Sequence, residues 1–290
     1  MNGLTKTTAG LICCVMVLAP GFSQQPPDPV VKQVTDNVYM INTGIANTGF
    51  IVGETEVLVV DAEMTSDAAG TMLEVIKKIT PKPVTKLVLT HSDGDHVNGI
   101  GGFPKGLEIY SSAEAKNEMA EEFKAQNLLN LLDYLPTKTF TDKMEIDLYP
   151  DTIQLLHFGP AHTSGDAVVF VPNKKLVFVG DLVFVGLDPL IHRHKGGTSS
   201  GLIETLQSVL SLAADKFIPG HNDVLSRNEI ETVLKDVQEK ADKVRSMVQE
   251  GKSMTETKEA FGIEDIPPKA GELNFPSLVE VIYLELTTGK

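Results

Sequence analysis

Short apolar runs alternate with polar, glycine-bearing turns along most of the chain, and this pattern predicts a protein that contains both strands and helices. Short runs rich in valine, isoleucine and leucine are typical of strands when turn residues bound them. We expect strands at residues 34–41, 49–52, 57–60, 84–89, 108–110, 153–158, 167–171, 176–179 and 216–218. The segment 53–56, which reads GETE, separates two of these strands and indicates a hairpin.

Longer segments in which apolar residues recur at helical spacing predict the helices. We expect them at residues 66–79, 113–132, 200–213 and 228–250, while the type of element at 278–286 stays open. The apolar stripe of segment 228–250 indicates an amphipathic helix packed on a sheet, with its lysines and glutamates in solvent. Strands and helices come in groups without strict alternation. The fold class is therefore α/β (α+β), in a single domain over residues 34–290.

The N-terminus differs from the rest in composition. Lys6 precedes an apolar run over residues 9–19, and the small residues Gly21 and Ser23 follow it. This predicts a signal peptide over residues 1–23, cleaved near Ser23, and hence a periplasmic or secreted protein. A membrane anchor is the alternative, but the run is short for a span, so we expect no stable membrane insertion after cleavage. Residues 24–33 are proline-rich and predict a flexible arm.

Cysteine content and charge exclude several classes of function. Cys13 and Cys14 are the two cysteines of the chain and lie inside the predicted signal peptide, so the mature chain offers no thiolate nucleophile or ligand. The formal net charge is −14 at pH 7, which argues against nucleic acid and anionic membranes as partners. We expect a small-molecule substrate, and the oligomeric state is not predicted.

Residue types that bind metals gather where the apolar run 84–89 ends. The following segment 90–99 reads THSDGDHVNG and places His91, Asp93, Asp95 and His96 within six positions. Imidazole and carboxylate groups suit zinc well and manganese or iron acceptably. Side chains at 91, 93 and 95 point the same way in an extended turn, whereas the one at 96 points across. One short peptide can thus serve two neighbouring metal positions.

Three further histidines or aspartates follow predicted strands at glycine or proline turns. They are His162 in GPAHTSGD, Asp181 in VFVGD and His221 in FIPGH. A lone histidine is more often structural, but four separate strand-end positions of this kind are hard to obtain by chance. Asp61 is another carboxylate at the end of a predicted strand, that at 57–60.

The turn resembles the HxHxDH motif of the metallo-β-lactamase superfamily, and the three later residues follow in the order of that family's remaining ligands. The resemblance implies an αββα sandwich with His91, residue 93 and His162 in a first metal site. It implies a second site formed by Asp95, His96 and His221, with Asp181 bridging the two sites. It also implies a metal-dependent hydrolase in which metal-activated hydroxide attacks an ester, thioester, lactone or lactam carbonyl, with Asp95 as the catalytic residue that orients the nucleophile.

Position 93 departs from that motif, because this chain reads HxDxDH. An aspartate can bind zinc through oxygen, but it is shorter than histidine and carries a charge. Without a cation, the carboxylates of Asp93, Asp95 and Asp181 would face one another. We therefore expect two zinc ions, with the first site weaker or altered in metal preference. A single ion in the Asp95, His96 and His221 site is the alternative, and manganese or iron stays open.

Other functions and the substrate-binding residues also stay open at this point. The alternatives are a phosphodiesterase-type member of the superfamily and a non-catalytic metal-binding or maturation protein. We expect loops 43–48 and 184–198 to select the substrate. The second loop carries a group of charged and histidine residues that either binds an anionic substrate group or is simply solvated. They are Asp188, His192, Arg193, His194 and Lys195.

Overall fold

Two β-sheets packed face to face form the centre of the protein. The computed structural model describes residues 29–264 and 275–289. The first sheet has the strand order β1-β2-β3-β4-β5-β6-β7. Its strands are β1 (Val30–Gln33), β2 (Val38–Asn42), β3 (Asn47–Val52), β4 (Val57–Val60), β5 (Val84–Val88), β6 (Glu108–Ser112) and β7 (Lys138–Phe140). The pairs from β1 to β4 are antiparallel, and those from β4 to β7 are parallel.

The second sheet has the order β13-β12-β11-β10-β9-β8. Its strands are β8 (Lys143–Leu148), β9 (Asp151–Leu156), β10 (Val168–Val171), β11 (Leu176–Gly180), β12 (Lys216–Pro219) and β13 (Leu225–Ser226). Neighbouring strands are antiparallel except β11 and β12, which run parallel.

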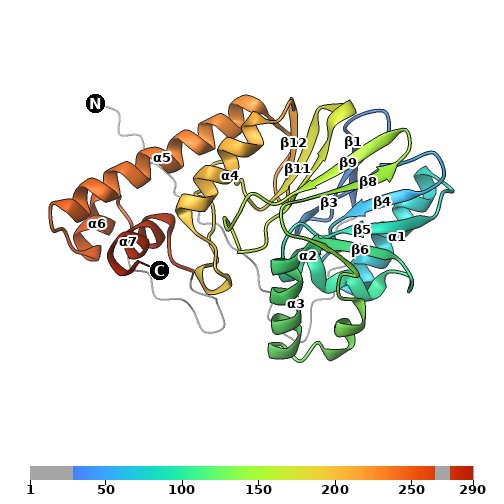
Figure 1. Cartoon of the computed structure of the whole chain (residues 1–290), viewed down its shortest axis with the longest axis horizontal. Helices are drawn as coiled ribbons and strands as arrows, with labels where there is room; N and C mark the ends of the chain where they lie inside the picture. Colours follow the sequence, from blue (N-terminus) through green and yellow to red (C-terminus); the bar gives the residue numbers. More distant parts are fainter. Residues whose placement is uncertain (1–28, 265–274, 290) are drawn as a thin grey trace, which may run out of the picture.

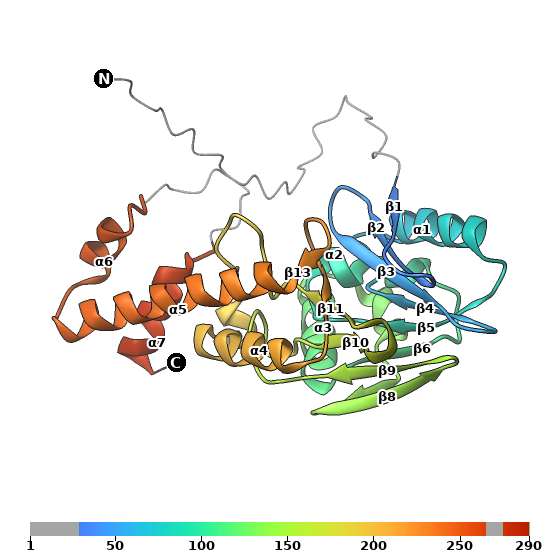
Figure 2. The ribbon, with the colours of Figure 1, turned by 90° about the horizontal axis from the view of Figure 1, so that it is seen from above.

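Helices cover the outer face of each sheet. The helices are α1 (Ser66–Ile79), α2 (Gly94–Val97), α3 (Ala113–Ala125), α4 (Ser199–Ser211), α5 (Arg227–Gln249), α6 (Met254–Ala260) and α7 (Leu278–Thr288). The side chains of α1 and α3 pack with the first sheet, and those of α4, α5 and α7 pack with the second. Helices α5, α6 and α7 extend away from the sheets at one end of the molecule (Figures 1 and 2).

Apolar side chains fill three layers, which hold this architecture together. The layer between the sheets contains Ile51 from the first sheet and Phe178 from the second. The sheets approach closely there, because a Cβ atom on Gly49 would lie 2.1 Å from the Phe178 ring. Met72 lies in the layer under α1, and Phe217 in the layer under α4 and α5. The order is therefore helix, sheet, sheet and helix, and the predicted αββα sandwich is confirmed.

Local sequence explains where the helices beside the site begin and end. Helix α1 coincides with the predicted helix 66–79, and the Thr65 hydroxyl accepts a hydrogen bond from the Ala68 amide at its start. Helix α3 ends at Ala125, so the predicted extension to residue 132 is wrong. Asn127 has a φ of 59°, a left-handed conformation that an α-helix cannot continue through.

The structure of the N-terminal residues corrects two predictions. The flexible arm predicted over residues 24–33 is wrong at its end, because Val30–Gln33 form β1 and pair with β2. The strand predicted at 34–41 begins only at Val38, because the polar segment before it turns and the Val34 amide donates to the Val38 carbonyl. The predicted signal peptide, residues 1–23, lies outside the described residues.

Several other elements differ from or complete the predictions. Strands β7 and β8 and helix α6 were not expected, and the open element near the C-terminus is the helix α7. The predicted hairpin is confirmed, because β3 and β4 are antiparallel and the Gly53 amide donates to the Glu56 carbonyl. In the described part of the chain, no helix combines the length and hydropathy that a bilayer crossing requires.

Candidate metal centre

The ends of several strands bring all seven predicted ligands to one edge of the two sheets. His91, Asp93, Asp95 and His96 follow β5, Asp181 follows β11, and His221 follows β12. The ligands form two positions. The first position comprises His91, Asp93, His162 and Asp181, and the second comprises Asp95, His96 and His221. Within each position, the donor atoms all lie within 4.8 Å of one another. The structure thus brings together the residues that the sequence nominated, in two neighbouring clusters.

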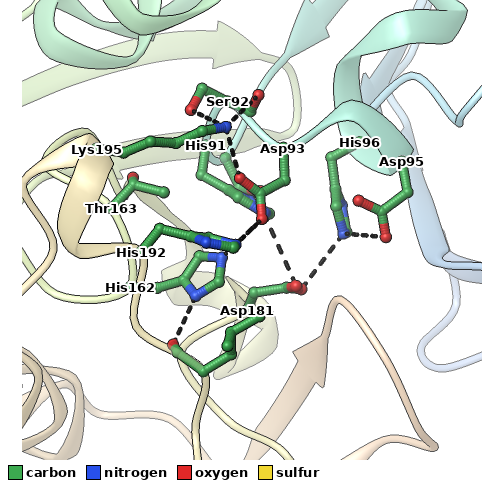
Figure 3. Close-up of polar contacts among 12 residues, drawn as sticks. His91, Ser92, Asp93, Asp95, His96, His162, Thr163, Asp181, His192 and Lys195 are labelled. Carbon is green, nitrogen blue, oxygen red and sulfur yellow. Dashed lines mark hydrogen bonds and ion pairs between the residues drawn. The ribbon is translucent and has the colours of Figure 1, made fainter. Parts of the chain in front are cut away.

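Asp181 lies between the two positions (Figure 3). Its Oδ1 atom is 3.3 Å from Nε2 of His96, on the second position. Its Oδ2 atom is 3.3 Å from Nε2 of His221 and 3.9 Å from Nε2 of His91, which belongs to the first position. One buried carboxylate therefore faces both clusters.

The second position has the spacing of ligands around one ion. Oδ2 of Asp95 is 3.3 Å from Nε2 of His221 and 3.7 Å from Nε2 of His96. Ligand atoms held at about 2.0–2.1 Å from a tetrahedral ion lie about 3.3 Å apart. The measured distances agree with that spacing.

Unpaired donor atoms show that the centre fits a divalent metal. Nε2 of His91, Nε2 of His96 and Oδ1 of Asp181 are buried and have no hydrogen-bond partner among the described residues. Buried polar atoms nearly always have a partner, so several orphans around one point indicate a missing common partner. Imidazole and carboxylate ligands of this kind suit zinc and other divalent transition metals.

Asp61, at the end of β4, supports the second position. Its Oδ2 lies 3.0 Å from Nδ1 of His96, and a carboxylate accepts hydrogen bonds, so Nδ1 is the donor. The Thr90 amide and hydroxyl donate to the same carboxylate at 2.8 and 2.9 Å. This arrangement fixes the tautomer that directs Nε2 of His96 into the site. Sequence reasoning marked Asp61 only as a strand-end carboxylate and missed this role.

A loop from the second half of the chain surrounds the first position. Nδ1 of His162 donates to the Leu190 carbonyl at 2.7 Å. Nε2 of His192 lies 2.7 Å from Oδ2 of Asp93, and the Lys195 ammonium donates to Oδ1 of Asp93 at 2.9 Å (Figure 3).

These contacts correct both predictions made for the loop 184–198 at two of its residues, His192 and Lys195. His192 is 5% exposed, and the Lys195 side chain is 10% exposed, so neither is a solvated loop residue. Both face Asp93 instead of an anionic substrate group, and Asp188 forms an ion pair with Lys240 on α5. His194 is exposed.

Two glycines are the sequence signal that could have revealed this docking. Gly196 has a φ of 78°, and a Cβ atom on Gly197 would lie 2.2 Å from the His162 carbonyl oxygen. The pair after Lys195 in the sequence HKGG therefore marks a close approach to the segment that carries His162.

Comparison with known families agrees with this geometry. The profile of a family described as "Metallo-beta-lactamase superfamily" matches residues 41–221, well over half of the chain. The chain belongs to the metallo-β-lactamase superfamily. The match includes all seven ligand candidates, whereas α5, α6 and α7 lie beyond it.

Two curated proteins and one solved structure are similar to this superfamily member. The 2,4-dinitroanisole O-demethylase subunit alpha of Nocardioides sp. (strain JS1661) is 26% identical over 73% of this chain and 63% of the relative. The linear primary-alkylsulfatase of Pseudomonas sp. (strain ATCC 19151) is 21% identical over 61% of this chain and 42% of the relative. The chain thus spans less than two thirds of either. The metallo-beta-lactamase from Pontibacter korlensis has 17% identity and a TM-score of 0.63, and the match covers 72% of this chain and 99% of that one.

Protons on histidines balance the negative charge of the centre in this superfamily member. Burial disfavours the charged form of His162, but the Asp93 carboxylate outweighs it and raises the pKa to about 10. Burial acts likewise on His221, and hydrogen bonds to Asp181 and Asp95 raise its pKa to about 9. Burial would raise the pKa of Asp93, but the charge of His162 and hydrogen bonds from His162 and His192 hold it well below its usual range.

Apolar side chains border the second position. The Phe184 ring stacks on the His221 ring with a centroid distance of 5.5 Å. In the loop 184–198, Val185 is 42% exposed, and its amide donates to Oδ1 of Asn222, the neighbour of His221. The loop 43–48 holds another exposed apolar residue, Ile45, which is 52% exposed. Both loops that the sequence nominated for substrate selection therefore carry an exposed apolar side chain, and that of the loop 184–198 lies beside the second position.

Proposed function

We propose that the protein is a metal-dependent hydrolase that holds two zinc ions. The observation that carries the proposal is the pair of His/Asp clusters that face one buried carboxylate, that of Asp181. Ions bound there would polarise a substrate oxygen and lower the pKa of a shared water to about 7. Relatives named for hydrolysis, such as the alkylsulfatase, support the same reaction class.

Two side chains of the second position, those of Asp95 and His221, have the exposure that a reacting substrate requires. The Asp95 side chain is 22% exposed, against 14% for Asp93 and 5% for Asp181. We assign to Asp95 the orientation of the attacking water and the acceptance of its proton. His91 is buried and serves to hold the first position instead.

The proposed substrates are small esters, thioesters, lactones or lactams with an apolar group next to the reactive carbonyl. The ring of Phe184 and the exposed side chain of Val185 support this choice, because they offer apolar surface beside His221 and its neighbour Asn222. The substrate's apolar part would lie on this surface while its carbonyl faces the second position.

A second candidate is the cleavage of alkyl or aryl oxygen compounds such as sulfate esters. It is favoured by the names of two relatives, an alkylsulfatase and a dinitroanisole O-demethylase subunit. The same apolar border would then hold an alkyl chain or an aromatic ring. We also propose export to the periplasm or beyond the cell, on the strength of the signal-like composition of residues 1–23.

The test combines metal analysis with a panel of substrates. Purified mature protein is expected to contain two zinc ions per chain and to hydrolyse at least one of a lactam, lactone, thioester, aryl ester, alkyl sulfate and phosphodiester. A chelator should abolish the activity, and zinc should restore it. Asp95→Asn should lower kcat by at least about 100-fold, since general acid–base groups contribute about 10²–10⁴-fold.

The matched control for that variant is Asp133→Asn, because the Asp133 side chain is 75% exposed and forms a surface ion pair. It should keep full activity. Activity that survives complete metal removal would overturn the proposal, as would a metal-loaded protein that is inert toward the whole panel. Turnover of the alkyl sulfate alone would select the second candidate.

A further inference from the structure

The segment 190–195 is joined to the first metal position by its backbone as well as its side chains. The His192 amide donates to the His162 carbonyl at 2.7 Å, and the Ser164 amide donates to the Lys195 carbonyl at 2.9 Å. The Leu190 carbonyl accepts from Nδ1 of His162 at 2.7 Å. The segment thus lies along the chain that carries one ligand, and its side chains reach a second ligand, Asp93.

The Lys195 ammonium is fully engaged by the turn that carries the ligands. Nζ donates to Oδ1 of Asp93 at 2.9 Å and to the carbonyl and hydroxyl oxygens of Ser92, both at 3.3 Å. An ammonium group has three donors, and these contacts account for all three. Because the side chain is 10% exposed, Lys195 places its positive charge beside Asp93 and largely out of solvent.

His192 contacts the other oxygen of the same carboxylate. Its Nε2 atom lies 2.7 Å from Oδ2 of Asp93. This is a hydrogen-bond distance, and His192 does not belong to the set of His91, Asp93, His162 and Asp181, whose donor atoms all lie within 4.8 Å of one another. His192 therefore acts on the ion through Asp93. Oδ2 also faces the Nε2 atoms of His162 at 3.0 Å and His91 at 3.9 Å, and so it is the oxygen directed at the first position.

We propose that His192 and Lys195 are positioning residues that make Asp93 a ligand of the first metal position. Lys195 holds and neutralises one oxygen of the carboxylate, and His192 fixes the direction of the other. An aspartate is shorter than the histidine of the HxHxDH motif and adds a charge, and this pair offsets both differences. The inference rests on the metal centre of the proposed function, but not on its hydrolytic reaction.

The experiment measures metal binding and not activity. The mature protein is freed of metal and titrated with zinc in a calorimeter, and its metal content is measured after dialysis. Lys195→Met removes the ammonium but keeps the stem, and His192→Gln removes the imidazole. Each should weaken one of two binding steps by about 10- to 100-fold, the usual cost of removing a group that orients a metal ligand. Lys195→Arg should retain most of the affinity, because it keeps a charged donor.

Two matched controls separate a specific effect from general disturbance of the fold. Lys82→Met removes a lysine that donates to the Gly53 carbonyl away from the centre, and Lys138→Met removes an exposed lysine that pairs with Glu108. Both should leave the two binding steps unchanged. Melting curves of the metal-free variants identify any protein that fails to fold.

Two double variants keep the proposal falsifiable. In a His162→Ala background, which lacks a first-position ligand, Lys195→Met should not change the binding of the remaining ion. In an Asp93→His background, Lys195→Met should raise zinc affinity, because an ammonium beside a neutral imidazole ligand repels the ion.

Three outcomes would overturn the inference. The first is that both binding steps are unchanged in Lys195→Met and in His192→Gln. The second is that Lys195→Met lowers zinc affinity as much in the His162→Ala background as in the wild type. The third is that Lys195→Met lowers zinc affinity in the Asp93→His background. A wild-type protein that binds no zinc would overturn the proposed function instead.

Discussion

The two metal positions are made from the same kinds of side chain, yet the fold supports them differently. The second position depends on a sheet edge, where Asp61 at the end of β4 fixes His96. The first position depends on the docking of a loop, whose residues His192 and Lys195 hold Asp93. A ligand fixed from a strand end moves only if the sheet moves. A ligand fixed from a loop can be altered without disturbing the core.

The positions also differ in their access to solvent. The His91 and His162 side chains are 1% and 0% exposed, whereas those of Asp95 and His221 are 22% and 26% exposed. The first position is thus enclosed, and the second borders the apolar surface around Phe184. Under the proposed function, a substrate would therefore reach the centre from the side of Asp95 and His221.

The largest expected effect on zinc binding comes from Asp181, because a change there should affect both positions alike. Asp181→Asn replaces the carboxylate that faces both clusters by a neutral amide, which is a far weaker metal ligand. Zinc binding should weaken by at least about 100-fold at both positions, beyond the usual effect of a supporting group. Calorimetric titration checks this, and a variant that loses only one binding step would contradict the bridging place of Asp181.

A smaller effect should isolate the second position. Asp61→Asn removes an acceptor for Nδ1 of His96 and leaves the loop around Asp93 in place. One binding step should weaken by about 10- to 100-fold. The other should change less, because Asp61 reaches His91 of the first position only through the Thr90 hydroxyl, which lies 2.9 Å from Nδ1 of His91. In a double variant with Lys195→Met, the two losses of zinc-binding free energy should add, because Asp61 supports His96 whereas Lys195 supports Asp93. Strong non-additivity would show that the positions do not act independently.

Crowding the second position should cost stability as well as affinity. A Cβ atom on Gly220 would lie 1.9 Å from Oδ1 of Asp181 and 2.8 Å from Cε1 of His96. Gly220→Ala should therefore lower the free energy of unfolding by about 1–3 kcal/mol, the usual cost of overpacking. Denaturant titration measures it. The control is Gly70→Ala in α1, where an added Cβ meets nothing within 4 Å and should stabilise the helix by up to about 1 kcal/mol.

A separate prediction concerns the dependence of zinc binding on pH. The raised pKa values of His162, about 10, and His221, about 9, mean that zinc binding must displace protons. Zinc affinity should fall as the pH is lowered from 9 to 6, by about tenfold per pH unit for each proton displaced. Titrations in buffers of different ionisation enthalpy count these protons, and a pH-independent affinity would contradict the charge balance.

The same pKa values set the opposite trend for the metal-free protein. A histidine whose pKa is higher in the folded than in the unfolded state stabilises the fold fully below its unfolded pKa, about 6.5. That contribution is lost as the pH rises through about 9 to 10. The melting temperature of chelator-treated protein should therefore fall over this range, whereas that of zinc-loaded protein should not.

Most strands and helices could be predicted from the sequence, because they have strong local patterns of apolar and polar residues. Helix α1 matches its predicted bounds, since a capping threonine and an amphipathic stripe mark it. Strands β7 and β8 escaped prediction because they are partly exposed and mix charged residues with apolar ones. Residues 30–33 were predicted as part of a flexible arm but form β1. The four residues of this strand are exposed and show no burial pattern, so the strand exists only through its pairing with β2.

The sequence by itself determined the seven residues of the candidate centre, because each follows an apolar strand in a short turn and strand ends converge at a sheet edge. Only the tertiary structure decided what holds them. Asp61 lies 35 residues from His96, and Lys195 lies 102 residues from Asp93. No local pattern links such partners, because their contacts arise when separate strands and loops pack together. The charge beside Asp93, and with it the character of the first position, is therefore a property of the folded chain.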